Sequence, residues 1–140
     1  MYEKYFDGWD VRNEFHREFV SIFNGWLGTS NLHKLDEVKE SDWNKFNDLI
    51  QCIFGKYNLQ IINCEEKSCI PVESVNSILQ THADYQEKDS SQFIRLLISE
   101  LDCLITEDWD CTYIIWHKNN GAVEALAPLI KSVDLYSFHD

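Results

Sequence analysis

Most of the chain alternates apolar and polar residues at a helical period, and this pattern limits the possible folds more than any other feature of the sequence. Within residues 11–26 the apolar side chains recur at steps of three and four, which places them on one face of an α-helix. The same steps recur in residues 41–54, 71–82, 90–104 and 122–135. We therefore expect four or five amphipathic helices.

Two short runs depart from this period. Residues 58–62 and 111–116 are rich in β-branched and aromatic side chains and are bounded by turn-prone residues, as strands are. Residues 119–121, Asn-Asn-Gly, predict a turn, and residues 136–140 are expected to pack through their aromatic rings and then fray. The sequence thus predicts a predominantly helical α+β domain with a small sheet of two or three short strands.

The length and composition predict one globular domain over residues 1–140. A chain of 140 residues with 44% hydrophobic residues can bury a core but is short for two domains. No stretch approaches the roughly 18 apolar residues that span a membrane, and residues 1–10 lack the apolar region of a signal peptide. The five cysteines, an odd number, fit free thiols in a reducing compartment. We expect a cytoplasmic protein that does not contact a membrane.

The sequence lacks the local signatures of common cofactor and catalytic sites. Its five scattered glycines cannot form a phosphate-binding loop, and neither a nucleophile elbow nor an HExxH motif is present. Cys64 and Cys69 have no second Cys or His pair at a zinc-finger spacing. His82 is in helical phase with apolar neighbours, and His117 has no partner located by the sequence. We expect no enzyme activity, no cofactor and no metal.

The charge of the chain is more informative. Its 24 acidic and 12 basic residues give a net charge of −12, which would repel nucleic acid over most of the surface. Residues 71–140 carry 4 bases against 12 acids, and residues 84–110 alone carry 2 against 8. We therefore expect no direct binding of nucleic acid and a cationic protein as the partner.

The centre of this acidic segment is Trp109, which lies among three carboxylates. At an interface an indole buries a large area, while surrounding acids pair with the partner's Arg and Lys. The alternative is that Trp109 packs in the core and its acids are only solvated. A second acidic cluster, residues 36–43, has the same ambiguity, although Trp43 is in phase with apolar neighbours and is expected in the core. The candidate partner-binding residues are all in the acidic segment: Glu107, Asp108, Trp109, Asp110, Glu100, Asp102, Asp84 and Glu87.

A small acidic domain with free cysteines and no catalytic motif resembles the immunity proteins of bacterial polymorphic toxin systems, including those of contact-dependent growth inhibition. Residues 105–119 and the chain from there to residue 140 are similar in style to such proteins. The resemblance implies that the protein binds its cognate toxin, often a basic nuclease, and covers the active site or substrate cleft without chemistry of its own.

Two other functions stay open. One is a nucleic-acid mimic that inhibits another basic protein, although the mixed Lys and Glu pattern of the first half fits this poorly. The other is a small hydrolase with an unrecognised site.

Overall fold

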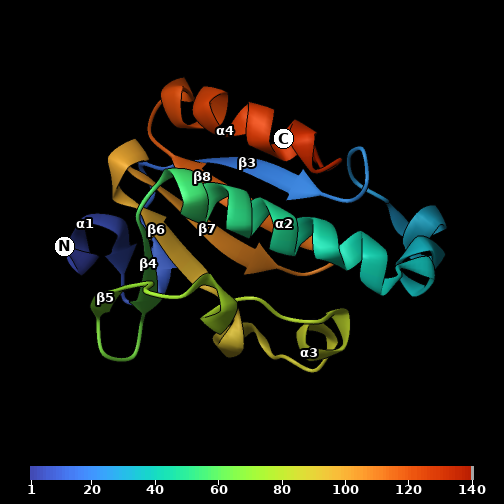
Figure 1. Ribbon diagram of the computed structural model, residues 1–140, viewed down its shortest axis with the longest axis horizontal. Helices are drawn as coiled ribbons and strands as arrows, with labels where there is room; N and C mark the ends of the chain where they lie inside the picture. The colour runs from blue at the N-terminus through green and yellow to red at the C-terminus, as the bar shows by residue number, and fades with distance from the viewer. Residues whose placement is uncertain (140) are drawn as a thin grey trace.

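A computed structural model describes residues 1–139, which form a seven-stranded antiparallel sheet with the strand order β5-β4-β6-β7-β8-β3-β9 (Figure 1). Strands β6, β7 and β8 are consecutive in sequence and adjacent in space, and they form the centre of the sheet. The strands are β3 (His16–Ser21), β4 (Leu59–Asn63), β5 (Ser68–Pro71), β6 (Arg95–Ile98), β7 (Cys103–Asp108), β8 (Thr112–His117) and β9 (Tyr136–Phe138).

Two long helices, α2 (Glu40–Lys56) and α4 (Asn120–Ser132), lie side by side across one face of the sheet, which we call the helix face (Figure 1). Among residues 1–139 no helix has both the length and the apolar character that crossing a bilayer requires. The shorter elements are α1 (Tyr2–Tyr5), the hairpin of β1 (Phe6–Asp7) and β2 (Asp10–Val11), α3 (His82–Gln86), and the 3₁₀ segments Thr29–Glu37, Val75–Ser77, Ser90–Gln92 and Ser99–Leu101.

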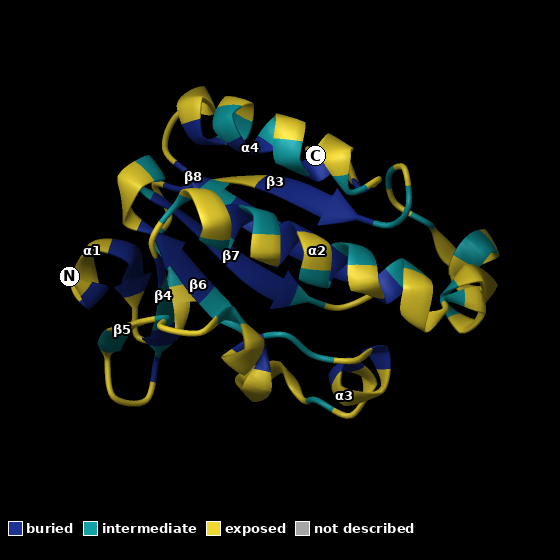
Figure 2. Ribbon diagram, in the orientation of Figure 1, coloured by how far each residue is buried: buried dark blue, intermediate teal, exposed yellow. Residues whose placement is uncertain are grey.

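The main core lies between the helix face and the two long helices. Trp43 of α2 is fully buried and stacks on Tyr85 of α3 with a centroid separation of 4.3 Å. Phe46, one turn further along α2, stacks on Tyr113 of β8 at 4.4 Å. Both long helices turn their buried sides to the sheet (Figure 2). The predicted core position of Trp43 is confirmed, as are the helices expected over 41–54 and 122–135.

A smaller core lies on the opposite face of the sheet, which we call the second face. The N-terminal segment packs its rings, including Phe6 and Phe15, against Leu97 of β6 and Leu104 of β7. Because this segment is short, it covers only part of the face. Toward β3 and β9 the face carries a ring cluster of Phe19, Trp26 and Phe138, of which Trp26 is exposed.

The prediction of a predominantly helical domain is wrong, because strands replace two of the expected helices, and a mainly irregular segment with a short 3₁₀ turn replaces a third. Residues 11–26 include β3, residues 71–82 begin at the end of β5, and residues 90–104 contain β6 and the start of β7. A step of four residues is even, so it keeps side chains on one face of a strand as well as of a helix. Phe15 and Phe19 illustrate this ambiguity, since both lie on the second face.

The expected strands are confirmed as β4 and β8, but the turn expected at residues 119–121 is wrong. Asn119 is the N-cap of α4, and its side-chain oxygen accepts a hydrogen bond from the backbone N–H of Gly121 at 2.9 Å. Turn and cap use the same residue types, so the sequence alone did not separate them. Residues Tyr136–Phe138 form β9 at the sheet edge, whereas Asp140, at the end expected to fray, lies outside the described residues.

Candidate partner-binding surface

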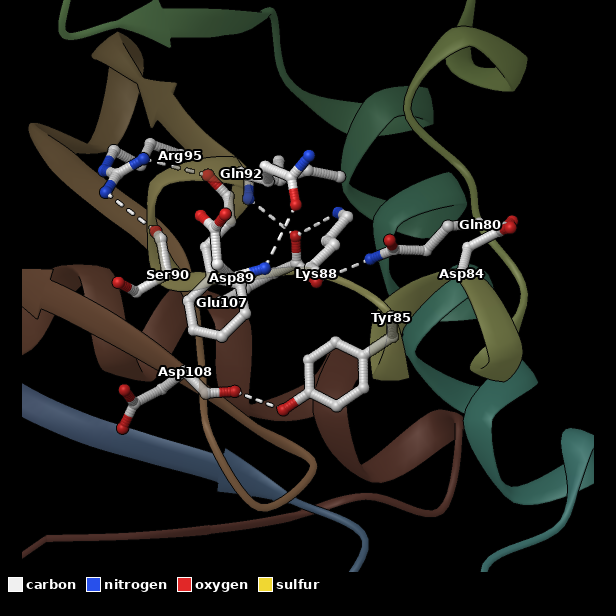
Figure 3. Close-up of polar contacts among 12 residues, drawn as sticks. Gln80, Asp84, Tyr85, Lys88, Asp89, Ser90, Gln92, Arg95, Glu107 and Asp108 are labelled. Atoms are coloured by element: carbon white, nitrogen blue, oxygen red, sulfur yellow. Dashed lines mark hydrogen bonds and ion pairs between the residues drawn. The ribbon is translucent and has the colours of Figure 1, made fainter.

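Strand β7 ends in two successive acids that point to opposite faces of the sheet. Glu107 pairs with Tyr113 on the helix face, and its side chain has no exposed surface. Its Oε1 accepts hydrogen bonds from Lys88 Nζ at 2.8 Å and from the backbone N–H of Ile94 at 2.6 Å. Its Oε2 accepts one from Gln80 Nε2 at 2.6 Å (Figure 3). The expectation that Glu107 contacts a partner is therefore corrected: this carboxylate holds residues 80–94 against the sheet.

The network around Glu107 also fixes α3 to the turn between β7 and β8. The hydroxyl of Tyr85 donates to the backbone carbonyl of Asp108 and accepts from the backbone N–H of Cys111 (Figure 3). At the other end of this segment, the carboxylate of Glu40 accepts a hydrogen bond from the backbone N–H of His82 at 3.0 Å. The N-terminus of α2, helix α3 and the β7–β8 turn thus meet at one end of the molecule, which we call the acidic end.

The β7–β8 turn holds Trp109 out of the core. Asp110 and Cys111 have φ values of 60° and 53°, a left-handed conformation that costs energy for residues other than glycine and that Asp tolerates better than most. Trp109 is 54% exposed and contacts the ring of Phe93 edge-on at a centroid separation of 4.8 Å. The core position that the sequence left open for Trp109 is therefore not the one observed.

Exposed carboxylates lie at the acidic end together with Trp109. Asp84 and Glu87 come from α3 and the residue after it, and Asp110 lies in the turn. Hydrogen bonds from Thr81 lower the pKa of Asp84, which keeps this carboxylate ionised at neutral pH. Lys88, from the same segment, is paired with Glu107, and its charge also contributes to lowering the pKa of Asp84. The further acids here are Asp36, Glu37, Glu40, Asp42 and Asp89.

Glu100 and Asp102 lie at the opposite end of β7, so they do not belong to this surface. Asp102 comes six residues before Asp108, which is roughly 20 Å along the strand at about 3.3 Å per residue. Asp102 accepts hydrogen bonds from Tyr5 Oη at 2.7 Å and Lys4 Nζ at 3.1 Å. Glu100 accepts one from the backbone N–H of Asn58 at 2.6 Å. Both stabilise local structure, and the single acidic surface expected from residues 84–110 is split between two ends.

A groove of about 450 Å³ opens beside Trp109 on the second face. Its opposite wall is Trp9, 48% exposed, from the turn between β1 and β2. The guanidinium of Arg95 lies over the Trp9 ring at 5.3 Å and donates to the carbonyl of Phe93 at 3.0 Å. Asp108 also lines the groove; burial raises the pKa of its carboxyl, as does the charge of Asp110, against the lowering effect of the Trp109 N–H and Arg17.

Sequence reasoning missed the groove because its walls are about a hundred residues apart in the chain. Trp9 and Asp10 come before β3 in the chain, whereas Asp108 is the last residue of β7 and Trp109 lies in the turn after it. Only the pairing of the N-terminal segment with the second face brings them together. A tryptophan beside an acid in a polar N-terminal stretch was the one available signal, and it was not specific.

The groups that could serve catalysis or hold a metal are arranged less favourably. Cys111 Sγ lies 3.9 Å from His82 Nε2, but burial and Asp110 raise the pKa of the thiol to about 11, which opposes formation of a nucleophilic thiolate. Within residues 1–139 no three His, Cys, Asp or Glu side chains are placed to share a metal ion. The five cysteines are unpaired.

A cavity of about 990 Å³ lies by the N-terminus of α4 and is lined by three histidines. His16 and His117 are opposite each other on β3 and β8, with ring centroids 6.0 Å apart. His139 lies 3.5 Å from the buried carboxylate of Glu18. Histidine is the side chain that most often transfers protons in catalysis.

No family model, curated protein or solved structure matches the chain.

Proposed function

We propose that the protein is an immunity protein that binds and neutralises a cognate toxin, a basic nuclease domain, in the cytoplasm of the producing cell. The observation that carries the proposal is the exposed Trp109, which lies between Asp108 and Asp110 in a turn with two left-handed residues, at the end of the molecule where Asp84 and Glu87 are also exposed. The surface comprises Asp84, Glu87, Asp108, Trp109 and Asp110.

The mechanism follows from charge and rigidity. A nuclease holds phosphates in a cationic groove, and an anionic protein surface can occupy the same groove and compete with the nucleic acid. Close charge pairs at such an interface have coupling energies of about 1.5 to 7 kcal/mol, whereas pairs at the rim mainly change the association rate and its salt dependence. Trp109 supplies an aromatic anchor within the charged surface. Because Glu107 and Tyr85 hold the turn in place, little ordering is needed on binding.

The direct test is calorimetric titration of the protein against the toxin domain encoded beside it, with RNA and DNA cleavage assayed in parallel. The proposal predicts a saturable complex, inhibition that is complete at equal concentrations, and weaker association at higher salt. No heat and no inhibition at low salt would overturn it.

A small hydrolase is the second candidate, favoured by the histidine cavity at the start of α4. A carbonyl oxygen only accepts, so His117 donates from Nδ1–H to the carbonyl of Asn119 at 3.0 Å, which leaves Nε2 for proton transfer, as a general base requires. Turnover of chromogenic ester or phosphate substrates that His117→Ala abolishes would favour this function. Inhibition of the toxin that is unchanged in His117→Ala would favour the first.

A further inference from the structure

The alternation of β7 gives its last two acids different surroundings. Glu107 points to the helix face, where three donors satisfy its carboxylate. Asp108 points away from Tyr85 and from the Glu107 network, to the second face (Figure 3). There it lines the groove between Trp9 and Trp109. The carboxylate of Asp108 is half-buried, and the positive charge of Arg17 acts on its pKa more weakly than burial does.

The walls of the groove are aromatic and held in place. Trp116 lines its floor and donates from Nε1 to Thr106 Oγ1 at 2.9 Å. Trp109 is supported edge-on by Phe93, which leaves more than half of its surface open. On the opposite wall Arg95 stacks on Trp9, so the groove already contains one guanidinium on an indole.

The charge of the groove is complementary to a cation. Within the lining, Arg95 contributes one positive charge against the carboxylates of Asp10 and Asp108, and Arg17, outside the lining, adds a weaker attraction on Asp108. Arg95 is also directed to the carbonyls of Phe93 and Ser90, at 3.0 and 3.4 Å. Burial raises the pKa of Asp108, which means that its ionised form lacks full solvation. A cation placed beside it would stabilise that form.

We propose that the groove receives an arginine side chain of the partner, with its guanidinium between the carboxylate of Asp108 and the open face of Trp109; this rests on the proposed function in taking the partner to be a cationic protein. Arginine fits better than lysine for a physical reason. Its planar group stacks on an indole and donates two parallel hydrogen bonds to a carboxylate, whereas an ammonium is compact and strongly hydrated.

The test is a titration of the ¹⁵N-labelled full chain with N-acetyl-Gly-Arg-Gly-amide, followed by the indole N–H signals of the tryptophans. The control peptide carries citrulline, which keeps the shape of arginine and removes its charge. We expect the signals of Trp9 and Trp109 to shift with the arginine peptide, to shift little with the citrulline peptide, and to lose the effect at high salt. Asp108→Asn should weaken binding about tenfold, because a hydrogen-bonded charge is removed. Asp48→Asn, on the solvent side of α2, should leave it unchanged.

Equal shifts with both peptides, or unchanged binding by Asp108→Asn, would overturn the inference. Trp109→Ala is the second variant, since it keeps the carboxylate and removes the stacking surface; unchanged peptide affinity in it would also count against the inference. The two proposals fail separately. Peptide binding without toxin binding would overturn the immunity function and keep the groove. Toxin binding that neither Asp108→Asn nor Trp109→Ala weakens would overturn the groove and keep the function.

Discussion

Replacement of Glu107 tests whether a buried carboxylate positions the acidic end. Glu107→Gln keeps the size of the side chain and removes its charge. The oxygen of Gln80, buried and without a hydrogen-bond partner, can accept from the new amide if the Gln80 amide rotates, so the main loss is the ion pair with Lys88. We expect a loss of about 2 kcal/mol in the free energy of unfolding, since hydrogen bonds to charged groups contribute about 1.5 to 3 kcal/mol.

Glu107→Leu removes both acceptors and leaves the donors of Lys88, Gln80 and Ile94 without a partner. Breaking a buried pair in this way costs about 3 to 5 kcal/mol, and the lower part of that range applies because the Lys88 side chain is 18% exposed and can reach water. A domain of this size has a total stability of roughly 5 to 15 kcal/mol. The loss is therefore a large part of the total.

Urea unfolding followed by circular dichroism measures both variants, and hydrogen exchange locates the effect. We expect the amides of residues 80–94 to lose protection before those of the sheet centre. In the double variant Glu107→Leu with Lys88→Met, the unpaired charge is gone, so at least about 1 kcal/mol should be recovered. If Glu107→Leu lies within about 1 kcal/mol of the wild type, the reasoning is refuted.

Three further predictions concern stability. Folding raises the pKa of Asp108, so ionisation of this carboxyl reduces the stability of the fold as the pH rises through its folded pKa. Asp108→Asn should therefore be no less stable than the wild type at pH 7. A loss of stability in urea unfolding at pH 7 would contradict this. The pKa of Asp102 shifts in the opposite direction. Burial raises it, but hydrogen bonds from Tyr5 and Lys4 outweigh burial, so the net effect is a lower pKa. The stabilisation by the ionised Asp102 is therefore present at neutral pH and is lost as the pH falls through the folded pKa. Asp102→Asn should flatten this acid limb of the stability profile while costing less than about 1 kcal/mol, because the ion pair is exposed. Phe46→Ala should cost about 3 to 5 kcal/mol by thermal or urea unfolding, and a cost below 1 kcal/mol would show that the site collapses around the smaller side chain.

The sequence predicted the elements whose pattern is unambiguous. In α2, steps of three separate Trp43, Phe46 and Leu49, and an odd step means that no strand keeps these side chains on one face. The apolar residues of 90–104 have the same apparent helical period. In the structure, however, Asp102 adopts a left-handed conformation, which closes the hairpin of β6 and β7. The left-handed turn at Asp102 cannot be read from the residue type.

The candidate site was predicted in part. Trp109, Asp108 and Asp110 lie together because they are consecutive, and Asp84 joins them through contacts of α3 with the turn. Glu107 and Asp108 point to opposite faces of the sheet because they alternate along β7. The sequence analysis expected a helix up to residue 104 and a strand only from residue 111, so it did not predict this alternation. The opposite wall at Trp9 depends on long-range packing that periodicity does not encode.

Two double variants with the same change of net charge test most directly whether the acidic end binds a cationic toxin. Their affinity for the toxin is compared. Glu87→Lys with Asp110→Asn raises the charge of the acidic end by three units. Asn tolerates the left-handed backbone conformation found at residue 110. Glu65→Lys with Glu66→Gln makes the same change in the exposed turn between β4 and β5. Binding is measured at 50 mM and 300 mM salt. We expect the variant with Glu87→Lys and Asp110→Asn to associate more slowly and to bind the toxin about tenfold or more weakly, with the larger loss at the lower salt. The variant with Glu65→Lys and Glu66→Gln should have little effect. Equal losses from both pairs, or no loss from the first, would contradict it.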